Sequence, residues 1–306
     1  MNTEKLFQVS AAPHLHSEMS ITRIMLDVLI ALTPAAVMSA VWFGARTLLV
    51  MAVSIASCVA FESLWCLMMK KRVPVSDLSA VVTGLLLALN LPAAIPLWQV
   101  TVGAFVAIII VKQLFGGLGC NFANPALVGR VVMMISFPAM SQYSYPVDAV
   151  ASATPLAVIK AGGEPGLLDL FLGRCGGVMG ETCAASLLAG FVYLWLRRVI
   201  NPIIPGCFVG TVFILTAIAG SHPLESILSG GLLLGAIFMA TDYVTSPYSN
   251  LGKAVYGVGC GALTALIRLC GNLAEGVSFA ILLMNLLVPY INELSRKKPF
   301  GGEAHE

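Results

Sequence analysis

Two stretches of equal length decide the fold: residues 78–91, LSAVVTGLLLALNL, and residues 227–240, ILSGGLLLGAIFMA. A helix of 14 residues is roughly 21 Å long, which is shorter than the bilayer core of about 30 Å. The tetrapeptide Gly-Leu-Leu-Leu begins at Gly84 and again at Gly231, 147 positions later, and a polar turn with a proline follows each stretch. Paired short spans of this kind predict an internal repeat with a binding site between its halves.

The composition places the rest of the chain in a membrane. Of its 306 residues, 58% are hydrophobic and only 10% are charged, whereas about 25% is usual in soluble domains. The net charge of +2 gives no sign of a nucleic-acid partner. Because the eight cysteines form no C-x-x-C pair, we expect no zinc or iron–sulfur site, and no metal site, in this chain. No apolar segment precedes residue 24, so no cleaved signal peptide is expected.

Ten apolar runs follow one another along the chain, with about half of them on each side of a longer polar segment. They predict an all-α integral membrane protein of about ten transmembrane helices. Residues 1–23 form an N-terminal segment, 24–137 a first five-helix repeat, 138–180 an external loop, 181–292 a second repeat and 293–306 a tail. The runs are 24–43, 47–69, 78–91, 97–115, 125–137, 181–199, 203–220, 227–240, 254–270 and 277–292.

An odd number of spans per repeat inverts the second repeat relative to the first. With ten spans, twelve of the 17 Lys and Arg residues fall on the side of the N-terminus. Four fall on the other side, namely Arg46, Lys160, Arg174 and Arg268, and Arg130 lies within the fifth run. The positive-inside rule therefore puts both termini in the cytoplasm and the 138–180 segment outside. A chance match of four residues in a leucine-rich chain is the alternative to a repeat.

Few ionisable residues stand within the apolar runs, and such residues are functional candidates. Asp27 is an ion-path candidate, although it lies near a span end where an interfacial role is common. Glu62 is either an ion-path group or the partner of a buried cation. Arg130 is a candidate partner for Glu62, or for a flavin or phosphate. Glu181 is a candidate for cofactor binding, or simply suits the helix dipole at the start of a span.

Two stretches without a helical pattern fall at membrane depth, Gly116 to Asn124 and Asp242 to Asn250. Their backbone polar groups cannot be left in hydrocarbon, so they must be buried in protein or line a cavity. Both are predicted pocket walls.

The external segment contains the sequence Asp148-Ala-Val-Ala-Ser152-Ala-Thr154-Pro155-Leu-Ala. By itself, it predicts only a threonine held in an extended backbone by the following proline. Together with other motifs along nearly the whole chain, it resembles the D subunits of Rnf complexes and the related B subunits of the sodium-pumping NADH:quinone oxidoreductase. The other matching motifs are VSAAPH (9–14), GGLGCN (116–121), NPA (124–126), GET (180–182), ATD (240–242) and VSFA (277–280).

The resemblance implies that Thr154 carries FMN through a phosphoester bond made by a dedicated flavin transferase. Asp148 and Ser152 match the pattern that such a transferase recognises. Ala151 departs from it, because a hydroxyl residue is usual at that position, and this puts efficient flavin transfer in doubt. The flavin-carrying role comes from the resemblance and not from the composition or spacing.

The resemblance further implies a redox-driven translocase in a bacterial inner membrane, which passes electrons between ferredoxin and NAD and moves Na⁺ or H⁺. The implied partners are the A, B, C, E and G subunits of the Rnf complex, especially the G subunit as the other carrier of covalent FMN, together with membrane lipid. A second, non-covalent flavin, with riboflavin as the candidate, is expected near the cytoplasmic side. The candidate cofactor-binding residues besides Thr154 are Asp148, Ser152, Gly119, Asn121, Asn124, Arg130, Glu181 and Asp242.

A channel or secondary transporter for a small solute is the rival interpretation, because inverted repeats with broken spans are also a transporter architecture. The Thr154 motif separates the two interpretations, since a solute transporter has no use for a tethered flavin.

Overall fold

A computed structural model describes residues 20–70, 75–141, 154–161, 163, 165–271 and 276–296. Within these ranges every regular element is a helix and none is a strand. The predicted all-α fold is confirmed, and each of the ten apolar runs contains helix.

The elements follow the order of the predicted runs. The first five runs form α1 (Ile21–Phe43), α2 (Ala45–Met68), α3 (Ser79–Leu89), α4 (Leu97–Phe105) with the π-helix η2 (Val106–Gln113), and α5 (Pro125–Ser136). The last five form α8 (Ala184–Leu196), α9 (Ile203–Ile218), α10 (Pro223–Leu228) with α11 (Leu232–Leu234) and the π-helix η4 (Gly235–Met239), α12 (Asn250–Cys270), and α13 (Val277–Leu294). Two short 3-10 helices are η1 (Val75–Asp77) and η3 (Pro138–Ser141).

Four of these helices, α1, α2, α12 and α13, are long and apolar enough to cross a membrane by themselves. Several shorter apolar helices lie between them. The chain is therefore a multi-pass membrane protein. The two helices predicted to be short are short: α3 has 11 residues, and α11 and η4 together have eight.

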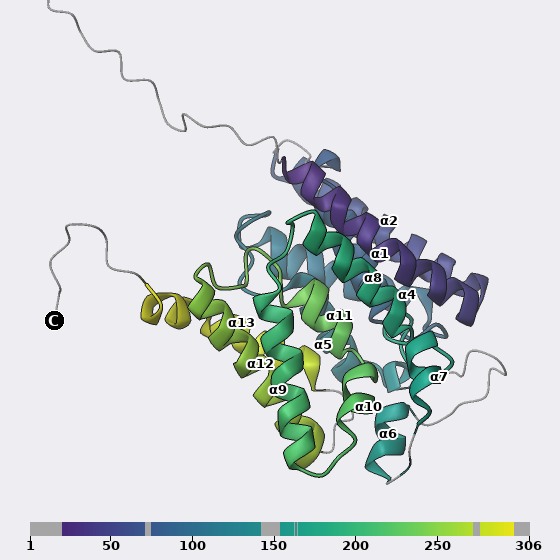
Figure 1. Cartoon of the computed structure of the whole chain (residues 1–306). Helices are drawn as coiled ribbons and strands as arrows, with labels where there is room; N and C mark the ends of the chain where they lie inside the picture. Colours follow the sequence, from purple (N-terminus) through teal and green to yellow (C-terminus); the bar gives the residue numbers. More distant parts are fainter. Residues whose placement is uncertain are drawn as a thin grey trace, which may run out of the picture.

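The segment predicted as a loop, 138–180, contains two further helices, α6 (Pro155–Lys160) and α7 (Leu167–Leu172). Both have only six residues, so neither forms an apolar run of membrane length. They lie beside α10, at the opposite side of the molecule from the start of α1 and the end of α13 (Figure 1).

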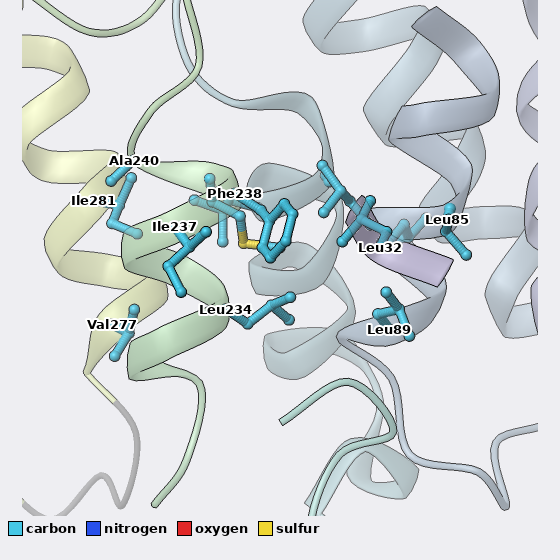
Figure 2. Close-up of a cluster of buried hydrophobic side chains, with 14 of the residues drawn as sticks. Leu32, Leu85, Leu89, Leu234, Ile237, Phe238, Ala240, Val277 and Ile281 are labelled. Atoms are coloured by element: carbon cyan, nitrogen blue, oxygen red, sulfur yellow. The ribbon is translucent and has the colours of Figure 1, made fainter. Parts of the chain in front are cut away.

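The two short helices form the centre of the core. Every residue of α11 and η4 is buried, and so is every residue of α3 except Val81. Figure 2 shows η4 between α13 on one side and α1 with α3 on the other, with the ring of Phe238 on the side of Leu32. Full burial explains why both short helices are apolar on all faces in the sequence.

Small residues let the helices approach one another closely. A Cβ atom on Gly190 of α8 would collide with the backbone carbonyl of Ala31 on α1 and would lie 2.9 Å from Phe238. A Cβ on Gly84 of α3 would lie 2.8 Å from the Cα of Ile55 on α2. Small residues at helix contacts are the usual device for packing helices in membranes.

Candidate functional site

An inner cavity of about 130 Å³ lies on the side of the molecule where α1 begins. Three predicted cofactor-binding residues, Asn121, Asn124 and Asp242, line it. The first two come from the glycine-rich loop before α5, and the third from the loop after η4. Both predicted pocket walls therefore meet at one cavity. Gly119, in the same loop, has a positive φ of 88° but is not among the lining residues.

Asn124 connects the start of α5 to the end of η4 at this cavity. Its Oδ1 accepts hydrogen bonds from the N–H groups of Ala126 (3.0 Å) and Leu127 (3.3 Å), so it caps α5. Pro125 follows as the first helical residue, a position where proline is common. The Nδ2 of Asn124 donates to the carbonyl of Met239 at 3.3 Å. The side chain of Asn124 thus forms hydrogen bonds with backbone groups at the start of α5 and at the end of η4.

Asp242 is held by its own loop. Its Oδ2 accepts a hydrogen bond from the hydroxyl of Thr245 at 3.1 Å. The loop is thereby fixed with the carboxylate at the cavity wall, where it can accept a hydrogen bond from a ligand.

Glu62 belongs to a buried cluster beside the inner cavity. Its Oε1 lies 2.7 Å from the Nζ of Lys112 and accepts a hydrogen bond from the Nε2 of Gln113, also at 2.7 Å. Lys112 donates in addition to the hydroxyl of Ser79 at 2.6 Å. Lys112 and Ser79 line the cavity. We call these four residues the inner cluster. Lys112, counted from the sequence as a basic residue of the inner side, is only 3% exposed.

Asp27, the other ion-path candidate, is also paired. It is buried, and Arg197 contacts both of its carboxylate oxygens, each at 3.2 Å from Nη2. The hydroxyl of Tyr193 donates to its Oδ1 at 2.9 Å. The carboxylate thus connects α1 to the end of α8.

An outer cavity of about 30 Å³ lies at the opposite side, and Thr154 is part of its wall. Glu181 and Thr182 line the same cavity. Thr154 is the N-cap of α6, and its Oγ1 accepts a hydrogen bond from the N–H of Ala157 at 3.4 Å. The structure therefore brings the predicted attachment residue together with Glu181. Asp148, Ala151 and Ser152 lie outside the described residues.

Arg130 does not pair with Glu62, which corrects one of the two partners considered from the sequence. Its Nη1 lies 2.8 Å from Oε1 of Glu181 and donates to Oδ1 of Asn90 at 2.5 Å. The Nδ2 of Asn90 donates to the carbonyl of Leu86 at 2.6 Å. We call Arg130, Glu181 and Asn90 the outer cluster. Arg130 and Glu62 lie toward opposite sides of the molecule, a separation that a linear sequence does not reveal.

Burial also shapes the chemistry of the outer cavity. Cys175 is part of its wall, and burial, assisted by the neighbouring Cys183, Asp169 and Glu181, raises the pKa of its thiol to about 12. Because a nucleophilic cysteine acts as the thiolate, Cys175 is not a nucleophile at neutral pH.

Sequence reasoning did not assign a role to Lys112, Gln113, Asn90 or Thr182. Lys112 and Gln113 stand three and two residues before the end of an apolar run, and this position was the only available signal. Asn90 was visible as a polar residue at the end of a short span. Thr182 was visible only as part of the Gly180-Glu181-Thr182 motif.

Comparison with known proteins gives the family. The profile of the NQR2, RnfD, RnfE family matches residues 8–301. The chain belongs to this family. It is 44% identical, over 96% of its length and 95% of the relative's, to the D subunit of the Na⁺-translocating ferredoxin:NAD⁺ oxidoreductase complex of Acetobacterium woodii. It is 40% identical, over 97% of each chain, to the D subunit of the proton-translocating ferredoxin:NAD⁺ oxidoreductase complex of Clostridium ljungdahlii.

A third member of the family, the D subunit of the ion-translocating oxidoreductase complex of Stutzerimonas stutzeri, is 37% identical over 93% of each chain. The family assignment made from the motifs is therefore confirmed. The relatives at 44% and 40% identity are named for different cations, so identity at this level does not specify the transported ion.

Proposed function

We propose that this chain is the flavin-carrying membrane subunit of a redox-driven, ion-translocating ferredoxin:NAD⁺ oxidoreductase of the Rnf type, and that Thr154 carries covalent FMN. The relatives support the complex, because they are named as its D subunit. The observation that supports the flavin site is the position of Thr154, in the wall of a cavity that also contains Glu181 and Thr182.

The residues of the outer cavity fit a tethered polar group. Thr182 is 3% exposed, and its hydroxyl makes no hydrogen bond with any described residue. A cavity of about 30 Å³ has room for about two water molecules, so it suits one polar end of a ligand and not a three-ring isoalloxazine. The ring of the flavin would then lie outside this cavity.

FMN, when bound, supplies the one- and two-electron chemistry that a protein side chain lacks. The chain's own residues supply placement and electrostatics. Thr154 fixes one end of the group and prevents its diffusion. Glu181 lines the cavity and is paired with Arg130, so the charge of its carboxylate is compensated. Asn90 holds Arg130 in place from the end of α3.

The inner cavity suits a second, uncharged flavin such as riboflavin. Asn121, Asn124 and Asp242 offer amide and carboxylate groups at its wall, and apolar side chains such as Leu86 and Phe238 form much of the remainder. Few polar groups on a mostly apolar surface are typical of small-molecule sites. Gly119 would contribute to ligand binding only through the shape that it gives its loop.

The proposal includes the location and the partners. Both termini are cytoplasmic and the Thr154 segment is outside, in a bacterial inner membrane. The A, B, C, E and G subunits of the Rnf complex are partners, the last of them as the other covalent-FMN carrier, and a flavin transferase modifies Thr154. Membrane lipid surrounds the complex. Glu62 and Asp27 remain the ion-path candidates, and Oε2 of Glu62 makes no hydrogen bond with any described residue.

A denaturing gel tests the proposal against the transporter alternative. The full chain, expressed with its flavin transferase, is expected to give a fluorescent band under ultraviolet light, and Thr154→Val is expected to abolish it. Asp242→Asn should leave the band unchanged, because Asp242 lines the inner cavity and not the outer one. A dark band from the unaltered chain would contradict a covalent flavin and would favour a solute channel or transporter.

A further inference from the structure

Three side-chain hydroxyls line the outer cavity, and they differ in how they are bonded. Ser229 donates to the carbonyl of Glu225 at 2.5 Å, and Thr154 accepts from the N–H of Ala157. The hydroxyl of Thr182 has no partner among the described residues, although the side chain is almost fully buried. A buried hydroxyl that makes no hydrogen bond destabilises the folded state. An unsatisfied hydroxyl of this kind is tolerated at a site that binds a ligand, because the ligand supplies the missing hydrogen-bond partner.

Two backbone donors lie on the same wall. Gly176 and Gly177 line the outer cavity, and the N–H groups of both make no hydrogen bond with any described residue. Backbone N–H groups and hydroxyls are the usual donors to phosphate. Glu181, the acid in the cavity wall, is paired with Arg130 at 2.8 Å, which reduces its repulsion of a phosphate.

We infer that the outer cavity is a phosphate subsite and that Thr182 is the residue that positions the phosphate of the flavin on Thr154. The inference rests on the proposed covalent FMN. In a phosphoester the phosphorus is one bond away from Oγ1 of Thr154, so the phosphate is the part of the cofactor nearest to this wall. The hydroxyl of Thr182 donates to a phosphate oxygen, and the N–H groups of Gly176 and Gly177 supply the remaining donors.

Thr264 provides a matched control. Its hydroxyl is also buried and without a partner among the described residues, but Thr264 lies on α12 and does not line the outer cavity. Thr→Val replaces a hydroxyl by a methyl group of similar size at both positions. Without a ligand, each substitution removes an unsatisfied polar group and should be neutral or slightly stabilising.

The experiment measures the thermal midpoint of the full chain in detergent, with Thr154 flavinylated and in the Thr154→Val background. Thr182→Val is expected to lower the midpoint of the flavinylated chain by about 3 °C or more, and to leave the Thr154→Val background unchanged or slightly raised. Thr182→Ser keeps a hydroxyl and should recover most of the loss. Thr264→Val should have the same effect in both backgrounds.

The two ideas fail in distinguishable ways. A dark band from the unaltered chain overturns the proposed function and the phosphate subsite together. A fluorescent chain in which Thr182→Val behaves like Thr264→Val overturns the phosphate subsite alone. A loss of stability from Thr182→Val that is equal in both backgrounds also overturns it, because it shows that the residue matters only for packing.

Discussion

The inner and outer clusters use similar side chains but connect different parts of the molecule. In the inner cluster, Glu62 of α2 pairs with Lys112 of η2, and Lys112 contacts Ser79 of α3. All these elements precede residue 138. In the outer cluster, Arg130 of α5 pairs with Glu181, which directly precedes α8 in the second half of the chain. The inner cluster therefore connects helices within the first half of the chain, whereas the outer cluster joins the first half to the second.

The two clusters also border cavities that suit different kinds of ligand. Both clusters contribute to a cavity wall, Lys112 and Ser79 to the inner cavity and Glu181 to the outer one. The inner cavity is the larger and contains three polar residues predicted to bind a cofactor. The outer cavity is small, and an attachment residue lies in its wall. A ligand that binds by contact alone suits the first site, and a tethered ligand suits the second.

The largest effect is expected from breaking the outer cluster. Arg130→Met leaves the buried Glu181 without this cation and removes the hydrogen bond to Asn90, and such changes cost about 3–5 kcal/mol. The yield of folded protein, measured by size-exclusion chromatography in detergent, should fall further than with any other substitution proposed for this chain. The double variant Arg130→Met, Glu181→Leu should recover much of the yield. A single variant that is as stable as the unaltered chain would contradict the joining role.

The inner cluster should tolerate substitution better. Glu62→Gln removes the negative charge but keeps an oxygen that Lys112 and Gln113 can contact, so we expect a loss of about 1–3 kcal/mol. Ion transport into membrane vesicles should decrease more than the flavin fluorescence of the chain. Equal losses of both would show that Glu62 is only structural.

Two glycines test how closely α1 packs against α8, at a distance from the outer cluster. Gly190→Ala should cost about 1–3 kcal/mol, because the added methyl group collides with the carbonyl of Ala31 across the α1–α8 contact. Gly210→Ala on α9 is the control, since its Cβ would meet nothing within 4 Å, and it should be neutral or stabilising by about 0.5–1 kcal/mol. Thermal unfolding in detergent measures both. Equal effects would show that the α1–α8 contact is not closely packed.

Cysteine labelling tests which side is outer without changing the fold. Cys120 and Cys270 are both exposed and lie on the predicted inner and outer sides. In intact cells, a membrane-impermeant maleimide should label Cys270 and spare Cys120 until the membrane is opened. Cys175, with a pKa near 12, should stay unlabelled at pH 7 and react only as the pH approaches that value. Labelling of Cys120 in intact cells would contradict the orientation.

The helices and the short central spans could be predicted because apolar length is visible in the sequence. The Asn124–Pro125 start of α5 could be predicted because a cap and a first-turn proline are local signals. The pairing of Lys112 with Glu62 and of Arg130 with Glu181 could not, because it depends on how helices far apart in the chain pack. The role of Thr182 could not be predicted for a different reason: an unbonded hydroxyl is recognisable only once its neighbours are known.

Mass spectrometry of the peptide that contains Thr154 tests the central claim most directly, with the chain isolated from its native membrane. The account predicts that this threonine carries the mass of FMN less one water, and that the addition is absent from Thr154→Val. An unmodified Thr154 in the native complex would contradict the claim.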